Sequence, residues 1–594
     1  MKKTSALSII LAFCATGLLA QQAADTVAPE GPGAGASAGW PIEMRAALSA
    51  KAAGQPVTAQ NWMVAAANPH AVKAGSDVLA AGGTAADALV AVQLVLGLVE
   101  PQSSGLGGGA FLVWYDAETA TITTVDGRET APLAVTPRLF QDDAGAPLPF
   151  FDAVVGGLSV GVPGTPALLE HAHERWGRQP WASLFSAAQN LAEQGFVVSP
   201  RLARMVEFDQ ERLARHVTTA AYFLPDGAPI KAGDILRNPA YAITLDRFAK
   251  AGASTFYAGP LGKEIVQAVQ TAPTAGLLSE IDLAIYSVKE RPAVCAPYRG
   301  HEVCGMGPPS SGAVAVGQIL GMLAAYDLSA GPQDPQVRRL MGDATRLAFA
   351  DRGRYLADSD FVPVPIQGLL APDYLKARAA FLDTDRALET VQPGAPEFDH
   401  ALHWADDESV ELPSTSHISI VDSDGNVASM TTTIENAFGA RLMVGGFLLN
   451  NELTDFSFRS HRDGVPIANR VAPGKRPRSS MAPTIVLKDG KPVLALGSPG
   501  GSRIISYVTQ AVIATIDWGL DVQSAVSVPH AVNRFGTYDL EAATPAAALE
   551  APLTELGFDV VSRPLTSGVH IIAIDGAQLI GGADPRREGI AHGE

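Results

Sequence analysis

Residues 415–434 have the sequence TSHISIVDSDGNVASMTTTI, in which two strand patterns flank a turn. Polar and apolar residues alternate over 417–421, which is typical of a β-strand. The cluster DSDGN at 422–426 is a strong turn signal, and residues 427–434 return to the strand pattern. We therefore expect a β-hairpin whose first strand begins next to Thr415.

The segment before this hairpin has a different composition. Residues 391–413 contain three prolines and, between Glu397 and Glu411, six Asp or Glu residues. Little periodicity accompanies them, so the segment is typical of an exposed acidic connector. A flexible connector that leads directly into a central strand makes the junction at 414–415 the first place to look for chemistry.

Two interpretations of this junction follow from the residues alone. Ser414, Thr415 and Ser416 all carry hydroxyls, and such residues often start strands without any chemical role. The alternative is that the chain is cut before Thr415. An N-terminal threonine combines a hydroxyl nucleophile with an α-amine of pKa about 7.7–8.0, which can accept the hydroxyl proton near neutral pH. An internal threonine has no such base.

The N-terminal part of the chain carries helix and strand signals on either side of a glycine-rich segment. Apolar spacing predicts helices over 69–83 and 84–99, the second of them a buried core helix. The glycines of 103–109 precede strand patterns at 110–115 and 122–125. Because no Gly-Lys-Ser/Thr follows these glycines, close backbone packing explains them better than a phosphate site does.

The composition is typical of a globular protein, and the first residues are typical of an exported one. Hydrophobic residues make up 47% and charged residues 18%, and the net charge of −18 argues against sequence-independent binding to nucleic acid. Residues 1–20 have two lysines, an apolar stretch shorter than a membrane span and a small final residue, as in a signal peptide. We expect residues 21–60 to form a disordered leader and the protein to be periplasmic or secreted.

Two cysteines, Cys295 and Cys304, would remain after the signal peptide is removed. A tight turn at residues 299–300 would place them opposite each other in a hairpin, where an oxidising compartment could close a disulfide. Two buried thiols are an equally open alternative. Two cysteines cannot supply a four-thiolate site and no histidine pair is near them, so no metal is expected here.

The hairpin and a series of other motifs resemble one known family. Residues 415–426 look like the start of the small subunit of gamma-glutamyltransferases, which are N-terminal nucleophile hydrolases made as one self-cleaving precursor. The resemblance implies an α+β fold, a four-layer αββα sandwich. Other segments of the chain also match the family, in the family's order: 99–109, 126–132, 308–312, 361–365, 449–457, 474–481, 497–503 and 583–587.

The resemblance also implies a cleavage site and catalytic residues. The cut would separate Ser414 from Thr415, giving a large subunit (61–414) and a small subunit (415–594) that form a heterodimer. Thr415 would be the nucleophile, its freed amine the base and Thr433 a supporting threonine. Gly500 and Gly501 would offer backbone N–H groups to an oxyanion, although a plain tight turn would explain them too.

The same resemblance assigns residues to the head group of the substrate. Arg128, with Ser479 and Ser480, would bind the α-carboxylate through charge-assisted hydrogen bonds, while Glu452 and Asp455 would bind the α-ammonium. A zwitterionic glutamyl group requires this division of charge. Taken singly, each residue type occurs more often in surface ion pairs, and only their joint presence favours a binding site.

Three features depart from the family pattern. One is Ser414 before the cut, which should be tolerated because attack on its carbonyl depends mainly on the Thr415 hydroxyl. Glu435 stands where many members have asparagine, which adds negative charge near the ammonium site and leaves room for a different acyl group. The segment 457–477 is shorter than in members with a lid, so we expect an open pocket.

The expected activity is therefore self-cleavage, followed by transfer of a γ-glutamyl group from glutathione or a related donor to water or an amino acid. No cofactor is needed because the nucleophile, base and oxyanion donors belong to the protein. One alternative is a related acylase acting on a non-glutamyl amide. An alternative of another class is an uncut, inactive binding protein.

Overall fold

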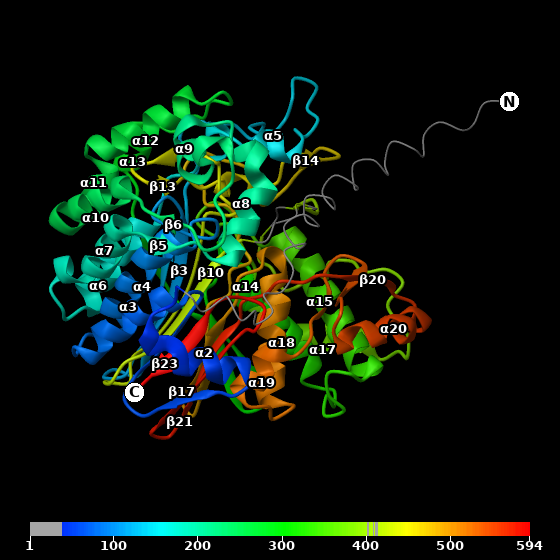
Figure 1. Ribbon diagram of the computed structural model, residues 1–594. Coiled ribbons are helices and arrows are strands. Elements are labelled where there is room, and N and C mark those ends of the chain that lie inside the picture. Colours follow the sequence, from blue (N-terminus) through cyan, green and yellow to red (C-terminus); the bar gives the residue numbers. More distant parts are fainter. Residues whose placement is uncertain (1–38, 401–402, 408, 410–413) are drawn as a thin grey trace.

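The computed structural model describes residues 39–400, 403–407, 409 and 414–594 (Figure 1). The expected signal peptide and the start of the leader lie outside the described residues. The prediction of a disordered leader is wrong for its last part, which contains helix α2 (Arg45–Ala52) and strand β1 (Val57–Ala59). Strand β1 pairs with β22 (Gln578–Ala583), and Met44 and Ala47 are buried in the core, so this segment has partners that a disordered chain lacks.

The predicted hairpin is present. Strand β10 (Ser416–Val421) pairs antiparallel with β11 (Val427–Thr433), with Ser419 opposite Ser429. In the turn, the carboxylate of Asp422 accepts hydrogen bonds from the backbone N–H groups of Asp424 and Asn426, at 3.0 and 2.9 Å. Gly425 supplies the positive φ that the turn needs.

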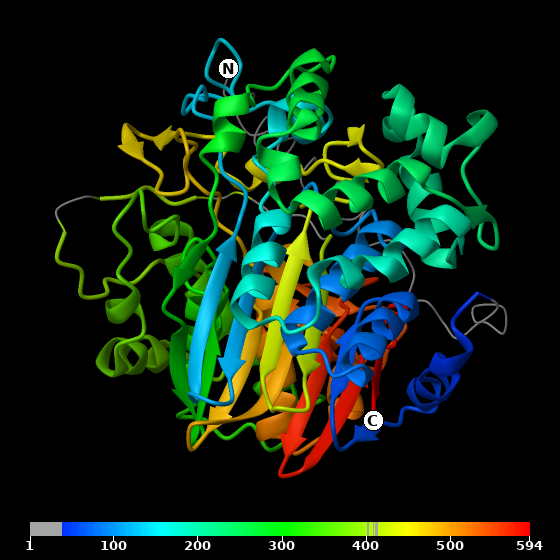
Figure 2. The same ribbon diagram turned by 90° about the vertical axis from the view of Figure 1, so that its left-hand side faces the viewer.

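The hairpin forms the centre of an antiparallel seven-stranded sheet. All residues of β10 and β11 are buried, which requires layers on both faces of these strands. The strand order is β23 (Ile590–Gly593), β2 (Met63–Ala66), β10, β11, β3 (Gly109–Asp116), β4 (Thr121–Gly127) and β7 (Lys289–Arg291). Figure 2 shows strands from the N-terminal region, in blue and cyan, beside those that follow residue 415, in yellow.

A second antiparallel sheet of seven strands packs against the first. An apolar cluster between them joins Val113 and Val427 of the first sheet to Ile485 and Ile572 of the second. The strand order of the second sheet is β1, β22, β21 (His570–Asp575), β17 (Lys491–Gly497), β16 (Thr484–Lys488), β9 (His301–Gly305) and β8 (Val294–Tyr298).

Helices cover the outer face of each sheet, so the four-layer αββα prediction is confirmed (Figure 1). The first sheet packs on helices that include α3 (Pro69–Ala80), α4 (Ala85–Val99) and α6 (Thr165–Trp176). The second packs on α14 (Gly312–Leu323), α15 (Pro335–Tyr355), α18 (Ile504–Ile516) and α19 (Val522–Ser527). No helix among the described residues is long and apolar enough to cross a membrane.

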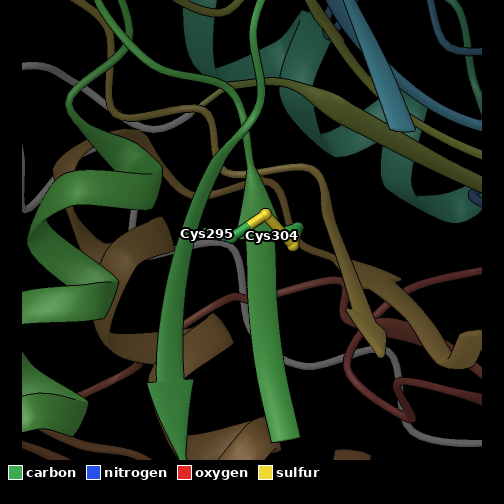
Figure 3. The surroundings of a disulfide bond; sticks show 2 residues. All are labelled: Cys295 and Cys304. Carbon is green, nitrogen blue, oxygen red and sulfur yellow. A yellow bond between two sulfur atoms is a disulfide. The ribbon is translucent and has the colours of Figure 1, made fainter. Parts of the chain in front are cut away.

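The two cysteines lie opposite each other on β8 and β9, and a disulfide joins them (Figure 3). The connecting turn has positive φ at Arg299 and Gly300, as a tight hairpin turn requires. Cys304 is buried between the sheets, whereas Cys295 is exposed on the edge strand.

Candidate active site

A small pocket lies where β10 begins and β11 ends. It brings together residues that are more than 350 positions apart in the sequence. Of the residues predicted to form the site, only Gly500 is absent from its lining. The lining consists of Arg128, Ser414, Thr415, Thr433, Glu435, Glu452, Asp455, Ser479, Ser480, Met481, Gly501 and Ile504.

Thr415 directly precedes β10, and Thr433 is the last residue of the neighbouring strand β11. The last pair of the ladder is Ser416 with Thr432, so Thr415 and Thr433 are one step beyond it. The hydroxyl oxygen of Thr433 accepts a hydrogen bond of 2.8 Å from the backbone N–H of Glu435. Its own hydrogen therefore remains available to donate towards the pocket.

The backbone around the expected cleavage site is held on both sides. Ser414 donates from its hydroxyl to the carbonyl oxygen of Gln102 at 2.7 Å. Arg587 donates from Nη1 to the carbonyl oxygen of Thr415 at 3.0 Å. The structure contains the uncut chain, in which the nitrogen of Thr415 is still a peptide nitrogen.

The two glycines after β17 approach the pocket differently. Gly501 lines it and begins the short 3-10 helix η7 (Gly501–Arg503), which continues into α18. Gly500 precedes this turn with φ 139°, and a Cβ there would lie 2.7 Å from the ring of Tyr507. Gly501 therefore supplies the backbone at the pocket wall, while Gly500 allows the turn that brings it there.

Arg128 is at the centre of the charged end of the pocket. It follows β4, and its guanidinium donates to Glu452 and, at 2.6 Å, to Asp455. Its Nε and Nη2 also donate to the carbonyl oxygens of Pro477 and Arg478, at 3.2 and 3.0 Å. The arginine and the two carboxylates, predicted to bind opposite charges of a ligand, are thus in direct contact.

These contacts change the ionisation of the groups. Burial alone would lower the pKa of Arg128, but the carboxylates of Glu452, Asp455 and Glu129 outweigh it and raise that pKa, so the guanidinium stays charged. Burial also raises the pKa of Glu452 well above its usual value, and the negative charges of Glu129 and Glu435 add to the rise, against the lowering effect of Arg128.

The two serines are arranged as hydrogen-bond donors. Ser480 accepts a hydrogen bond of 2.8 Å at its hydroxyl oxygen from Nη2 of Arg352, on α15. Ser479 accepts one of 3.1 Å at its hydroxyl oxygen from the backbone N–H of Met481. Because these bonds occupy acceptor positions, each hydroxyl keeps its hydrogen to donate to an anion. The pair is suited to a carboxylate.

Glu435 follows β11 in a left-handed backbone conformation, with φ 73°. Its carboxylate accepts a hydrogen bond of 2.5 Å from Nδ2 of Asn451, whose Oδ1 in turn accepts from the backbone N–H of Asn436. These bonds fix a further carboxylate in the pocket wall, beside the acidic end formed by Glu452 and Asp455.

The predicted site residues are buried in this uncut chain. Thr415 is 2% exposed, and Asp455, at 5%, is the most exposed of the predicted site residues in the lining. The ion pairs of Arg128 fill the charged end, and Ser414, on the other side of the peptide bond, forms part of the wall. A shorter 457–477 segment therefore does not expose these side chains to solvent.

Sequence reasoning missed three residues that support the site. Glu129, Arg352 and Arg587 lie in or near matching motifs or on a core helix, but no local pattern indicates which distant group each contacts. Glu129 directly follows the candidate residue Arg128, and this position is the sequence signal that could have indicated it. Among the described residues, no cluster of three or more His, Cys, Asp or Glu is arranged as metal ligands.

Comparison with solved structures defines the class of protein. A cephalosporin acylase from Bacillus halodurans has a TM-score of 0.80 and 25% sequence identity, over 91% of this chain and 97% of that chain. Together with the two sheets between helical layers, this likeness shows the α+β fold of N-terminal nucleophile hydrolases.

The chain belongs to the gamma-glutamyltranspeptidase family, whose sequence profile matches residues 71–594. A glutathione hydrolase proenzyme of Bacillus subtilis (strain 168) is 39% identical over 550 residues, which cover 90% of this chain and 92% of that protein. The Acylase ACY 1 proenzyme of Pseudomonas sp. (strain SE83) is 34% identical over 539 residues, 89% and 92% of the two chains. The predictions of the family and of an enzyme are confirmed.

Proposed function

We propose that this chain is a self-cleaving γ-glutamyl transferase and hydrolase with Thr415 as its nucleophile. The observation that carries the proposal is that the Ser414–Thr415 junction and the charged residues suited to an amino acid line one pocket. The similarity to a glutathione hydrolase proenzyme supports both the cut and the substrate class.

Maturation would begin with attack of the Thr415 hydroxyl oxygen on the carbonyl carbon of Ser414. The C–N bond between the two residues breaks, and the nitrogen takes the proton of the hydroxyl. The carbonyl carbon of Ser414 is then joined to the Thr415 oxygen as an ester. Water then cleaves this ester, giving a carboxylate on Ser414 and free hydroxyl and amino groups on Thr415. The hydrogen bonds to Gln102 and Arg587 hold the two sides of the junction in place for this attack.

Donor binding would use both ends of the charged cluster. The α-carboxylate takes the hydroxyl donors of Ser479 and Ser480 and shares the guanidinium of Arg128. The α-ammonium lies against the carboxylates of Glu452 and Asp455, and Glu435 adds negative charge beside them. Four carbon–carbon bonds separate the α-carboxylate carbon from the γ-amide carbonyl carbon, which would then face Thr415.

Turnover would follow the same chemistry as maturation. The free α-amine of Thr415 accepts the hydroxyl proton while the oxygen attacks the γ-carbonyl carbon. The backbone at Gly501 stabilises the negative oxygen, and the hydroxyl of Thr433 donates to the nucleophile. Collapse expels the donor amine with that proton and leaves a γ-glutamyl ester, which water or an amino acid's amine then cleaves.

The mature enzyme would be a heterodimer of a large subunit that ends at residue 414 and a small subunit of residues 415–594, and it needs no cofactor. Export through the signal peptide of residues 1–20 would place it in the periplasm or outside the cell. Those compartments fit the disulfide between Cys295 and Cys304.

Substitution of the nucleophile tests the proposal. Thr415→Ala should accumulate as one chain without activity, whereas Thr415→Ser, which keeps a hydroxyl, should be cut and retain partial turnover. On a denaturing gel, the wild-type protein should give pieces of about 41 and 19 kDa. A single wild-type band with no turnover would favour the uncut binding protein, and a cut, active Thr415→Ala variant would refute the role of Thr415.

A related acylase is the second candidate, favoured by Glu435 and by the likeness to two acylases. A matched pair of anilides separates the candidates, since glutaryl anilide differs from γ-glutamyl anilide only in lacking the α-amino group. The carboxylates of the pocket predict faster cleavage of the γ-glutamyl compound. Preference for the glutaryl compound would assign the chain to the acylases.

A further inference from the structure

Glu129 is a buried acid beside the charged end of the pocket. Its side chain has 0% exposure, and neither carboxylate oxygen has a hydrogen-bond donor among the described residues. An ionised carboxylate in such a place would lack the solvation or pairing that its charge requires. The proposed reaction gives this residue no role so far.

The contacts of Glu129 explain how the acid is accommodated. The nearest cation, Arg128, lies 3.9 Å from Oε2 and is already bonded to Glu452 and Asp455. Glu129 and Glu452 both approach Nη1 of Arg128, and Oε2 of Glu452 also lacks a donor among the described residues. Two carboxylates accept hydrogen bonds but cannot donate, so a hydrogen bond between them requires a proton on one of them.

The charges around the pocket lead to the same conclusion. Three buried carboxylates lie around one guanidinium: Glu129, Glu452 and Asp455 around Arg128. Glu129 and Glu452 both approach its Nη1, and two ionised carboxylates held away from water beside one nitrogen are very unfavourable. The other titratable groups that act on Glu129 are the hydroxyls of Tyr257 and Tyr286, which are neutral at physiological pH.

We propose that Glu129 is a positioning residue that shares one proton with Glu452 and so keeps Glu452 against Arg128, at the end of the pocket that binds the amino-acid head group. This inference rests on the proposed function, because its readout is turnover of a γ-glutamyl donor. Glu129 touches no substrate. It acts through Glu452, by lowering the negative charge next to the guanidinium that shares the donor's α-carboxylate.

The pKa shifts have the direction that this role requires. Burial raises the pKa of Glu129 to about 8, against the lowering effect of Arg128. The shared proton is therefore present at neutral pH and is lost as the pH rises through about 8. Loss of the proton adds a negative charge beside Arg128, which weakens binding of the donor carboxylate and raises KM.

The experiment compares KM for a γ-glutamyl anilide in the wild type and in Glu129→Gln, from about pH 6.5 to 9. An amide of the same shape donates permanently to Glu452 and does not titrate. If the donor binds only the protonated cluster, the wild-type KM rises roughly tenfold between pH 7 and 9, and the Glu129→Gln KM does not. The donor's own ammonium titrates equally in both enzymes. The ratio of the two KM values therefore reports only the effect of Glu129 ionisation on donor binding.

Glu193→Gln, an exposed change on α7 (Ser186–Gln194), is the matched control and should follow the wild-type profile. A KM ratio that stays constant with pH would overturn the inference while leaving the proposed function intact. Absence of wild-type turnover would instead count against the proposed function.

A second measurement covers the case in which Glu129→Gln fails to fold. The carbonyl stretch of a protonated carboxylic acid should appear in the infrared spectrum of wild-type protein near neutral pH and disappear above about pH 9. No such titrating band in the wild-type spectrum would overturn the shared proton.

Discussion

Arg587, near the C-terminus, donates a hydrogen bond of 3.0 Å from Nη1 to the carbonyl oxygen of Thr415. Both residues are buried, and the backbone oxygen of Arg587 is itself bonded to the side chain of Lys51. Arg587, which is not in the pocket lining, thus holds the backbone of the proposed nucleophile.

Removal of this bond should reduce turnover more than binding. Arg587→Ala leaves the Thr415 carbonyl without its donor, so we expect kcat to fall about tenfold or more with little change in KM. Arg587→Lys should recover part of the loss, and the exposed Arg247→Ala serves as the control. Steady-state kinetics check this, and an unchanged kcat in Arg587→Ala would remove the residue from the account.

Arg128→Lys tests the forked contact to the donor carboxylate. A lysine keeps the charge near Glu452 and Asp455 but loses the two-pronged geometry, so KM for a γ-glutamyl anilide should rise about tenfold or more. Cleavage at residue 414 should continue, because the substitution spares the reacting groups. Kinetics together with a denaturing gel measure both effects. Wild-type KM in this variant would show that Arg128 does not bind the donor.

Ser480→Ala and Arg352→Gln should raise KM through one shared mechanism. The alanine removes a hydroxyl donor, and the glutamine weakens the group that orients it, so each change should cost about 1 kcal/mol of binding. Because the two residues are bonded, the double variant should lose less than the product of the single effects. Strictly multiplicative KM changes would contradict the coupling.

The disulfide between Cys295 and Cys304 should contribute to stability but not to chemistry, because it lies on the edge strand β8 and not in the pocket lining. It closes a short loop, so Cys295→Ala/Cys304→Ala should lower the free energy of unfolding by about 2–3 kcal/mol. Denaturant unfolding of both proteins measures this, with kcat and KM as controls. A loss of activity at full stability would require another role for the pair.

The hairpin and the helices α3 and α4 could be predicted because their signals are local. The turn at 422–426 determines the pairing of β10 with β11, and the Thr84–Asp87 capping box starts α4 one residue after the predicted boundary. The motif residues of the pocket followed from the family resemblance, and their burial in one pocket agrees with it.

The remaining features depend on contacts between distant segments. Arg352 and Ser480 are 128 positions apart, and Arg587 and Thr415 are 172 apart, so no periodicity reveals either bond. The leader boundary was misplaced because the pairing of β1 with β22 is also long-range. The ion pairs of Arg128 with Glu452 and Asp455 also join distant segments, so the length of a loop cannot indicate them.

The N-terminal sequence of the smaller fragment from active protein tests the central claim most directly. The account predicts one sequence, Thr-Ser-His-Ile-Ser, beginning at Thr415. A fragment that begins elsewhere, or full activity from a chain that remains uncut at this position, would contradict it.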